Sequence, residues 1–162
     1  MKADDLALLR ELHRDKMTQY LRHIAVAALI SDYEFNNAYQ YVINREDTHL
    51  RWLESAITEF GGTPETVATP TVTASAGKKN DMFLPLVAVD AEQAGVLVAK
   101  WKPRAAEIRS DRHRKLVGVI IGETSEGKRF FDQVGQGNDD LLGRRTNGAI
   151  TGDGVMPVRW VE

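Results

Sequence analysis

The chain of 162 residues contains no cysteine, which excludes disulfide bonds, thiolate catalysis and metal sites with sulfur ligands. No apolar run approaches the length needed to cross a bilayer, and the first residues carry too many charges for a secretory signal. The formal net charge of −2 gives no electrostatic basis for binding nucleic acid. These absences predict a cytoplasmic protein without nucleic-acid or membrane partners, in which any metal ligands are Asp, Glu or the four His residues.

The apolar residues recur at helical spacing and predict four helices, over residues 4–29, 33–60, 90–109 and 112–133. Short turns at Ser31-Asp32 and Ser110-Asp111 join these helices in pairs. Residues 63–85 are rich in Thr, Ala, Pro and Gly and predict a long crossover connection. The order of elements predicts an all-α bundle of two helical hairpins over residues 1–134, followed by a Gly-rich C-terminal arm over residues 135–162.

The helix expected over residues 33–60 carries two ionisable side chains, Glu46 and His49, in the middle of its inward face. Steps of four and three residues define this face, and its members are Phe35, Tyr39, Val42, Glu46, His49, Leu53, Ala56 and Phe60. An unpaired carboxylate is costly to bury. The pair therefore indicates either a functional metal site or a buried, hydrogen-bonded Glu–His pair, and the sequence leaves both interpretations open.

Further candidate ligands follow from the level of each residue in its hairpin, because residues equidistant from a turn lie at the same height. By this rule His13 shares a level with Glu46 in the first hairpin, and Glu92 shares a level with Glu126 in the second. Together with His49, these side chains predict a carboxylate-bridged site for iron or manganese in the bundle core. On the first helix, the inward stripe is expected to contain Leu6, Leu9, Met17, Tyr20, Ile24 and Ala27.

Three segments resemble ferritin-like proteins. Residues 46–54, Glu-Asp-Thr-His-Leu-Arg-Trp-Leu-Glu, resemble the Glu-x-x-His-x-x-Trp-Leu-Glu segment of bacterioferritins, and residues 18–23, Thr-Gln-Tyr-Leu-Arg-His, are similar to their first-helix Asn-Gln-Tyr-Phe-x-His. Residues 60–64, Phe-Gly-Gly-Thr-Pro, are similar to the Leu-Gly-Gly-x-Pro segment of rubrerythrin-like domains. The resemblance implies a ferritin-like bundle in which carboxylates and histidines bind two irons for iron oxidation, peroxide reduction or storage. It also implies that Tyr20 hydrogen-bonds a ligand at the site.

The chain departs from the family pattern at two ligand positions. His13 stands where the family has a glutamate, and the second Glu-x-x-His is replaced by Glu126 and Arg129, with Glu123 as an alternative ligand. An incomplete site, mononuclear or lost, is therefore predicted. The helix over 112–133 also has two equally plausible inward faces. One face contains Leu116, Val119, Glu123, Glu126 and Phe130, and the other contains Val117, Ile120, Thr124, Gly127 and Phe131 and turns both glutamates outward.

Three functions are compatible with these patterns. The first is an iron- or manganese-binding ferritin-like protein, with rubrerythrin-like oxidoreductase activity if the metal is redox-active. The second is a metal-free bundle that acts as an interaction or assembly module, in which Arg129 or another cation pairs with Glu46 and the arm 135–162 docks on a neighbouring subunit. The third is an enzyme that acts on an organic substrate in a remodelled pocket. A homodimer or larger homo-oligomer is expected, because Trp101, Trp160 and the arm offer apolar contact area.

Overall fold

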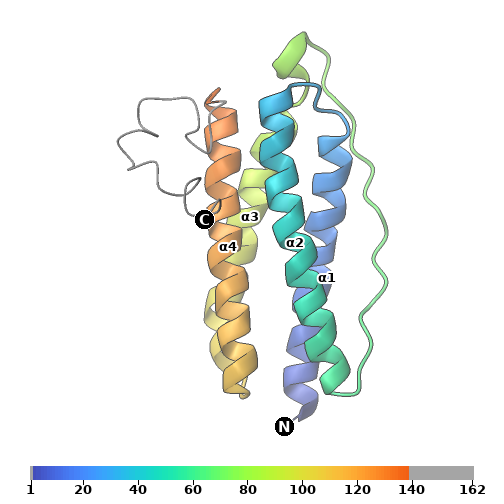
Figure 1. The fold of residues 1–162 in the computed structure, drawn as a ribbon, viewed down its shortest axis with the longest axis vertical. Helices are drawn as coiled ribbons and strands as arrows, with labels where there is room; N and C mark the ends of the chain where they lie inside the picture. Colours follow the sequence, from blue (N-terminus) through green and yellow to red (C-terminus); the bar gives the residue numbers. More distant parts are fainter. Residues whose placement is uncertain (1, 139–162) are drawn as a thin grey trace, which may run out of the picture.

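The computed structural model of the protein describes residues 2–138, and these residues form helices and connections without a β-strand. The α-helices are α1 (Lys2–Ala27), α2 (Tyr33–Glu59), α3 (Leu84–Arg104) and α4 (Asp111–Gly135), and the short 3₁₀ helices are η1 (Lys79–Met82) and η2 (Ala105–Glu107). The four α-helices lie side by side in one bundle (Figure 1), so the all-α prediction is confirmed. Of the predicted arm, residues 139–162 lie outside the described residues.

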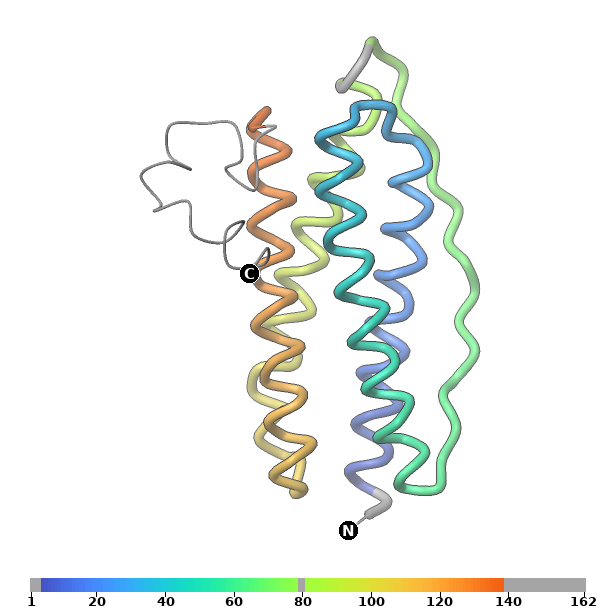
Figure 2. The backbone as a smooth tube through the Cα atoms, viewed as in Figure 1, coloured from blue at the N-terminus to red at the C-terminus, as the bar shows by residue number. Residues whose placement is uncertain are grey.

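The helices pack as two hairpins, α1 with α2 and α3 with α4, and the hairpins meet through α1 against α3 and α2 against α4. The connection over residues 62–78 follows the bundle from the end of α2 to the level of the α1–α2 turn (Figure 2). Because the chain returns to that end before α3 begins, α2 and α3 run in the same direction (Figure 1). No helix in the described part of the chain is long and apolar enough to cross a membrane.

Local signals set the ends of α2. The side chain of Asp32 caps its N-terminus and accepts a hydrogen bond of 3.0 Å from the backbone N–H of Phe35. At the other end, Gly61 adopts a φ of 78°, a conformation that favours glycine. Gly62 follows, and a Cβ there would lie 2.6 Å from Leu6 Cδ1. The two glycines therefore end the helix and let the chain pass close to α1.

Helix α3 differs from its prediction, because it begins at Leu84 and ends at Arg104 rather than spanning 90–109. Pro85 lies in the first turn, where a missing N–H costs no hydrogen bond. Burial of Phe83 and Val87 holds this early start against the core. Pro103 lies in the last turn, and the 3₁₀ helix η2 replaces the predicted continuation.

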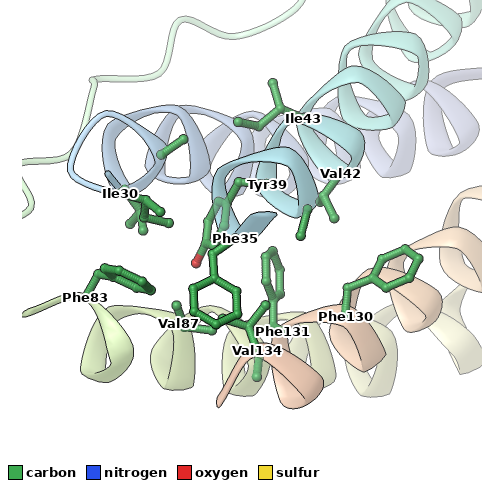
Figure 3. Close-up of a cluster of buried hydrophobic side chains, with 14 residues drawn as sticks. Ile30, Phe35, Tyr39, Val42, Ile43, Phe83, Val87, Phe130, Phe131 and Val134 are labelled. Carbon is green, nitrogen blue, oxygen red and sulfur yellow. The ribbon is translucent and has the colours of Figure 1, made fainter. Parts of the chain in front are cut away.

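The core consists of two apolar clusters with a polar layer between them. The first cluster includes Ile30, Phe35, Tyr39, Phe83 and Phe131 (Figure 3), and the second includes Leu9, Leu53, Trp101 and Ile120. We use "polar layer" for the buried polar side chains that the four helices carry between these clusters, namely His13, Lys16, Gln19, His23, Glu46, His49, Asp90 and Thr124.

Helix α4 presents the second of its two candidate faces to the core. Val117, Ile120 and Phe131 are buried, as are Thr124 and Gly127. Val119, which belongs to the other face, is 48% exposed. Glu123 and Glu126 therefore lie at the edge of the buried face, where both are partly exposed.

Candidate functional site

The centre of the polar layer is the carboxylate of Glu46, which lies in the buried face of α2 and is 3% exposed. Lys16 Nζ donates to Glu46 Oε1 over 3.1 Å. His23 Nδ1 lies 2.7 Å from Glu46 Oε2, and it donates because an ionised carboxylate only accepts. Lys16 and His23 are seven residues apart on α1, about two helical turns, so both side chains reach the same face of α2.

Lys16 is fully buried and connects three helices. Besides Glu46 on α2, its Nζ donates to Thr124 Oγ1 on α4 over 3.3 Å. Burial raises the pKa of Glu46, but the positive charges of His23 and Lys16 and the hydrogen bonds from both outweigh burial and lower that pKa to about 2. Glu46 is therefore ionised at neutral pH, with the ammonium of Lys16 on one oxygen and the imidazole of His23 on the other.

A second carboxylate, Asp90 of α3, extends the network toward the first apolar cluster. Asp90 is fully buried. Its Oδ1 accepts from Arg22 Nε over 2.6 Å, and its Oδ2 accepts from the hydroxyl of Tyr39 over 2.5 Å. His23 Nε2 lies 3.7 Å from Asp90 Oδ1. Burial, together with the charge and hydrogen bond of Asp90, raises the pKa of Tyr39 far above its usual range, so this phenol remains protonated.

His49, one turn beyond Glu46 on α2, pairs with α4 rather than with Glu46. Its Nε2 lies 2.5 Å from Glu123 Oε2. Burial and the nearby charge of Lys16 lower the pKa of His49, and the hydrogen bond and charge of Glu123 offset only part of this effect. The imidazole is therefore held in its neutral form, with the proton on the nitrogen that faces Glu123.

A small cavity of about 10 Å³ lies within the polar layer. Its lining includes Lys16, His23, Glu46, His49 and Glu123. A volume of this size is close to the minimum that accommodates one water molecule. The cavity in the polar layer therefore holds no organic substrate in this conformation.

The other predicted ligands lie apart from Glu46. His13 Nε2 lies 3.1 Å from Glu54 Oε1. His13 is about one helical turn before Lys16 on α1, on the side of the second apolar cluster. Glu126 pairs with Arg45 at the edge of the α2–α4 interface. Glu92 is exposed on α3. The carboxylate that α3 contributes to the core is Asp90, two residues earlier.

Two further predicted roles depend on Tyr20 and Arg129. Tyr20 is partly buried and packs against the first apolar cluster, where burial and the charges of Asp47 and Glu46 raise the pKa of its phenol. Arg129 has a side chain that is 63% exposed and lies 3.9 Å from Glu126. The cation that pairs with Glu46 is thus Lys16 and not Arg129.

Sequence reasoning missed Lys16, although the sequence holds a signal for it. The buried seam of α1 runs in regular steps of three and four residues through Leu9, Leu12, Lys16, Gln19, His23 and Val26, and Ile30 in the following turn continues it. The predicted stripe instead followed the more apolar positions, including Met17, Tyr20 and Ile24. Of these, Ile24 is 41% exposed. Periodicity identifies the seam only when polar residues are allowed to occupy it.

The chemistry of the donor set does not fit a metal ion in this arrangement. Glu46 already receives an ammonium on one oxygen and an imidazole N–H on the other, and a buried ammonium repels a second cation at that carboxylate. Among the residues that the structure describes, no three His, Asp or Glu side chains are grouped so that they could hold a metal ion.

The fold and the polar layer define an all-α four-helix bundle with a buried network of ion pairs. Comparison of the chain with models of protein families, with curated proteins and with solved structures gave no match. The geometry of the polar layer therefore carries the functional proposal.

Proposed function

We propose that the chain is a ferritin-like bundle in which the ammonium of Lys16 takes the central place of a metal ion, and that it acts as a metal-free interaction or assembly module. The observation that carries this proposal is the buried ion pair between Lys16 Nζ and Glu46 Oε1 at 3.1 Å. The parallel course of α2 and α3 and the Glu46-x-x-His49 segment support the ferritin-like assignment.

Each of the two buried carboxylates of the polar layer, Glu46 and Asp90, has a cationic partner. Lys16 and Arg22 carry one positive charge each, and Glu46 and Asp90 carry one negative charge each. Lys16 pairs with Glu46, and Arg22 pairs with Asp90 over 2.6 Å. Burying charge is tolerated when each ion is paired and hydrogen-bonded. A divalent cation at Glu46 would lie beside the buried ammonium of Lys16, so its binding would require Lys16 to leave.

The surface near the α1–α2 turn supports the assembly role. Three large apolar side chains flank this turn and are exposed, Ile24 at 41%, Leu29 at 38% and Tyr33 at 75%. Exposed apolar groups that gather in one region are typical of contact surfaces. Trp101, which the sequence suggested for this purpose, is fully buried and donates to Asp15 over 2.9 Å. Trp160 lies outside the described residues.

Metal loading and molecular mass test the two parts of the proposal. The purified protein and a His49→Ala variant are incubated aerobically with ferrous iron or with manganese, desalted, and analysed for metal content. We expect no stoichiometric metal in either protein. Stoichiometric metal in the parent that is lost in the variant would instead establish the iron- or manganese-binding oxidoreductase interpretation.

For the assembly part, light scattering after gel filtration compares the parent with a Tyr33→Asp variant. We expect a dimer or larger species in the parent and a smaller species in the variant. A parent protein that is monomeric across micromolar concentrations and associates with no second protein in a binding screen would contradict the module.

A further inference from the structure

Two residues that line the cavity in the polar layer each carry a buried polar atom without a hydrogen-bond partner among the described residues. These residues are Gln19 and His49, and both are more than nine-tenths buried. Gln19 Nε2 donates to the backbone carbonyl of Gln93 over 2.9 Å, whereas Gln19 Oε1 has no partner. His49 Nε2 faces Glu123, whereas His49 Nδ1 has no partner. Because buried polar groups are usually hydrogen-bonded, the two atoms indicate a ligand in the cavity.

The cavity brings together two free acceptors and one free donor. The amide oxygen of Gln19 only accepts, and Nδ1 of His49 also accepts because the neutral imidazole carries its proton on Nε2. The donor is Lys16, which lies about one turn before Gln19 on α1 and also lines the cavity. Its ammonium has three hydrogens. Within the described part of the chain, Glu46 and Thr124 accept two of them, so one hydrogen is left for a ligand.

These requirements describe a small neutral molecule that donates two hydrogen bonds and accepts one. A cation in the cavity would lie beside the ammonium of Lys16, and an anion would lie beside the carboxylates of Glu46 and Glu123, which also line it. An apolar molecule would leave all three polar groups unpaired, which is costly. The volume of about 10 Å³ admits one water molecule, and a buried water typically makes about three hydrogen bonds. Water therefore fits the cavity in size, charge and hydrogen bonding.

We propose that one buried water molecule in this cavity accepts from Lys16 Nζ and donates to His49 Nδ1 and Gln19 Oε1, and that the chain of groups Glu123–His49–water–Lys16 relays protons. The relay connects the buried ammonium of Lys16 on α1 to the edge of the α2–α4 interface. Its outer end reaches solvent, because the side chain of Glu123 is 29% exposed. The inference rests on the metal-free Lys16–Glu46 pair of the proposed function and is independent of the assembly role.

The relay moves hydrogens in one concerted step. One hydrogen passes from Lys16 Nζ to the water oxygen, the water gives one of its own to His49 Nδ1, and His49 gives its Nε2 hydrogen to Glu123. Lys16 becomes a neutral amine and Glu123 a neutral acid, while the water and the imidazole stay neutral. Glu123 exchanges its hydrogen with solvent, and the reverse step restores both charges. Repeated passage therefore exchanges the ammonium hydrogens of Lys16 with solvent, although Lys16 is fully buried.

Magnetic relaxation dispersion of the solvent tests the bound water, because it counts the water molecules that a protein holds for longer than it tumbles. His49→Phe keeps a ring and removes the Nδ1 acceptor. The matched control is His113→Phe, at a buried histidine that pairs with Ser110 and Glu59 and lies outside the cavity lining. We expect one long-lived water fewer in His49→Phe than in the parent, and no change in the control. Equal numbers in all three proteins, or a parent crystal structure without a water within about 3.2 Å of Lys16 Nζ and His49 Nδ1, would overturn the water site.

Hydrogen exchange of the Lys16 ammonium, followed by NMR, tests the relay in protein that elemental analysis shows to be free of metal. Glu123→Gln removes the proton acceptor of His49, and the control Glu126→Gln changes a carboxylate of similar exposure, 35%, that pairs with Arg45. We expect exchange at least tenfold slower in Glu123→Gln than in the parent and the control. Lost stability alone would accelerate exchange, so unchanged or faster exchange in Glu123→Gln would overturn the relay. Stoichiometric metal in the purified protein would instead contradict the proposed function.

Discussion

Among the described residues, Lys16 is the only lysine of the polar layer. Its ammonium contacts side chains of both α2 and α4. Removing one member of a buried ion pair leaves the other charged and unpaired, which costs several kcal/mol. Replacing both members by apolar residues avoids that cost. We therefore expect the Lys16–Glu46 pair to specify which residues meet in the layer more than it stabilises the fold.

A Lys16→Met variant should lose about 3 kcal/mol of unfolding free energy, because Glu46 then stays buried without its ammonium. The double variant Lys16→Met/Glu46→Leu should recover most of this loss. As a control, Lys100→Met removes partly exposed ion pairs with Asp15 and Glu11 and should change the free energy by less than about 1 kcal/mol. Urea denaturation at pH 7 measures all three. A Lys16→Met loss no larger than that of the control would contradict the role of Lys16.

The two lowered pKa values predict that stability falls as the pH is reduced. His49 has a folded pKa below its ordinary 6.5, so the unfolded chain binds a proton first and stability declines as the pH falls below 6.5. Glu46 has a folded pKa of about 2 against an ordinary 4.5. Its contribution is present above pH 4.5 and is lost as the pH falls toward 2, by about 3 kcal/mol.

Urea denaturation in steps from pH 8 to pH 3 tests this pH dependence. A His49→Gln variant serves as the control, because it should lose less stability between pH 7 and pH 5 than the parent does. A parent curve that is flat from pH 7 to pH 3 would show that neither group is perturbed as described.

At the scale of elements, the sequence predicts the helices well and their inward faces poorly. Asp32 and Ser110 are recognisable caps, and the structure places them at the starts of α2 and α4. The sequence leaves the inward face of α4 open, because its two stripes are equally apolar, and packing against α3 and α2 decides between them. The missed start of α3 has a similar cause, since Phe83 and Val87 are buried by contacts that no local pattern contains.

The candidate site was predictable in part for the same reason. Glu46 and His49 could be found because each interrupts a regular apolar stripe. Lys16 and Asp90 could not be found in this way. A lysine in a helix usually extends into solvent, and Asp90 looks like a residue of the first turn of a helix until the true start at Leu84 is known.

Helix α4 contains glycines that weaken it without serving a contact. A Cβ at Gly118 or Gly122 would meet no atom within 4 Å, and glycine within a helix costs roughly 0.5–1 kcal/mol relative to alanine. Gly118→Ala/Gly122→Ala should therefore raise the unfolding free energy by about 1–2 kcal/mol. Gly61→Ala, at a φ of 78°, should lower it by about 1 kcal/mol. Thermal and urea denaturation would contradict this interpretation if all three substitutions acted in the same direction.

At the scale of the whole molecule, Asp5 connects the two hairpins at the end distant from the α1–α2 turn. It is buried at 3% exposure, and its carboxylate accepts from the backbone N–H groups of Arg109 and Ser110 over 3.0 and 3.1 Å. A side chain of α1 thus accepts the hydrogen bonds of two backbone N–H groups in the turn between η2 and α4. The α3–α4 hairpin depends on α1 for the shape of its own connection.

An Asp5→Ala variant should lose about 2 kcal/mol of unfolding free energy, because two backbone donors are left without their acceptor. Hydrogen exchange should also accelerate at the amides of Arg109 and Ser110, well before it changes in the centre of α4. Asp5→Asn, which keeps one acceptor oxygen, should show a smaller effect. Unchanged exchange at both amides in Asp5→Ala would contradict the link between the hairpins.

The long connection over residues 62–78 has a consequence for how the bundle can be divided. It lies along the bundle in Figure 2 and belongs to neither hairpin. In terms of mass action, the two helical hairpins can be treated as the partners of a complex. The connection over residues 62–78 is the tether that keeps their local concentration high. A protease that cuts the tether would leave two fragments, each a complete hairpin, held together by the apolar clusters and by the hydrogen bond from Lys16 to Thr124 across the interface. The same two fragments, expressed as separate chains, should reassemble in a concentration-dependent manner.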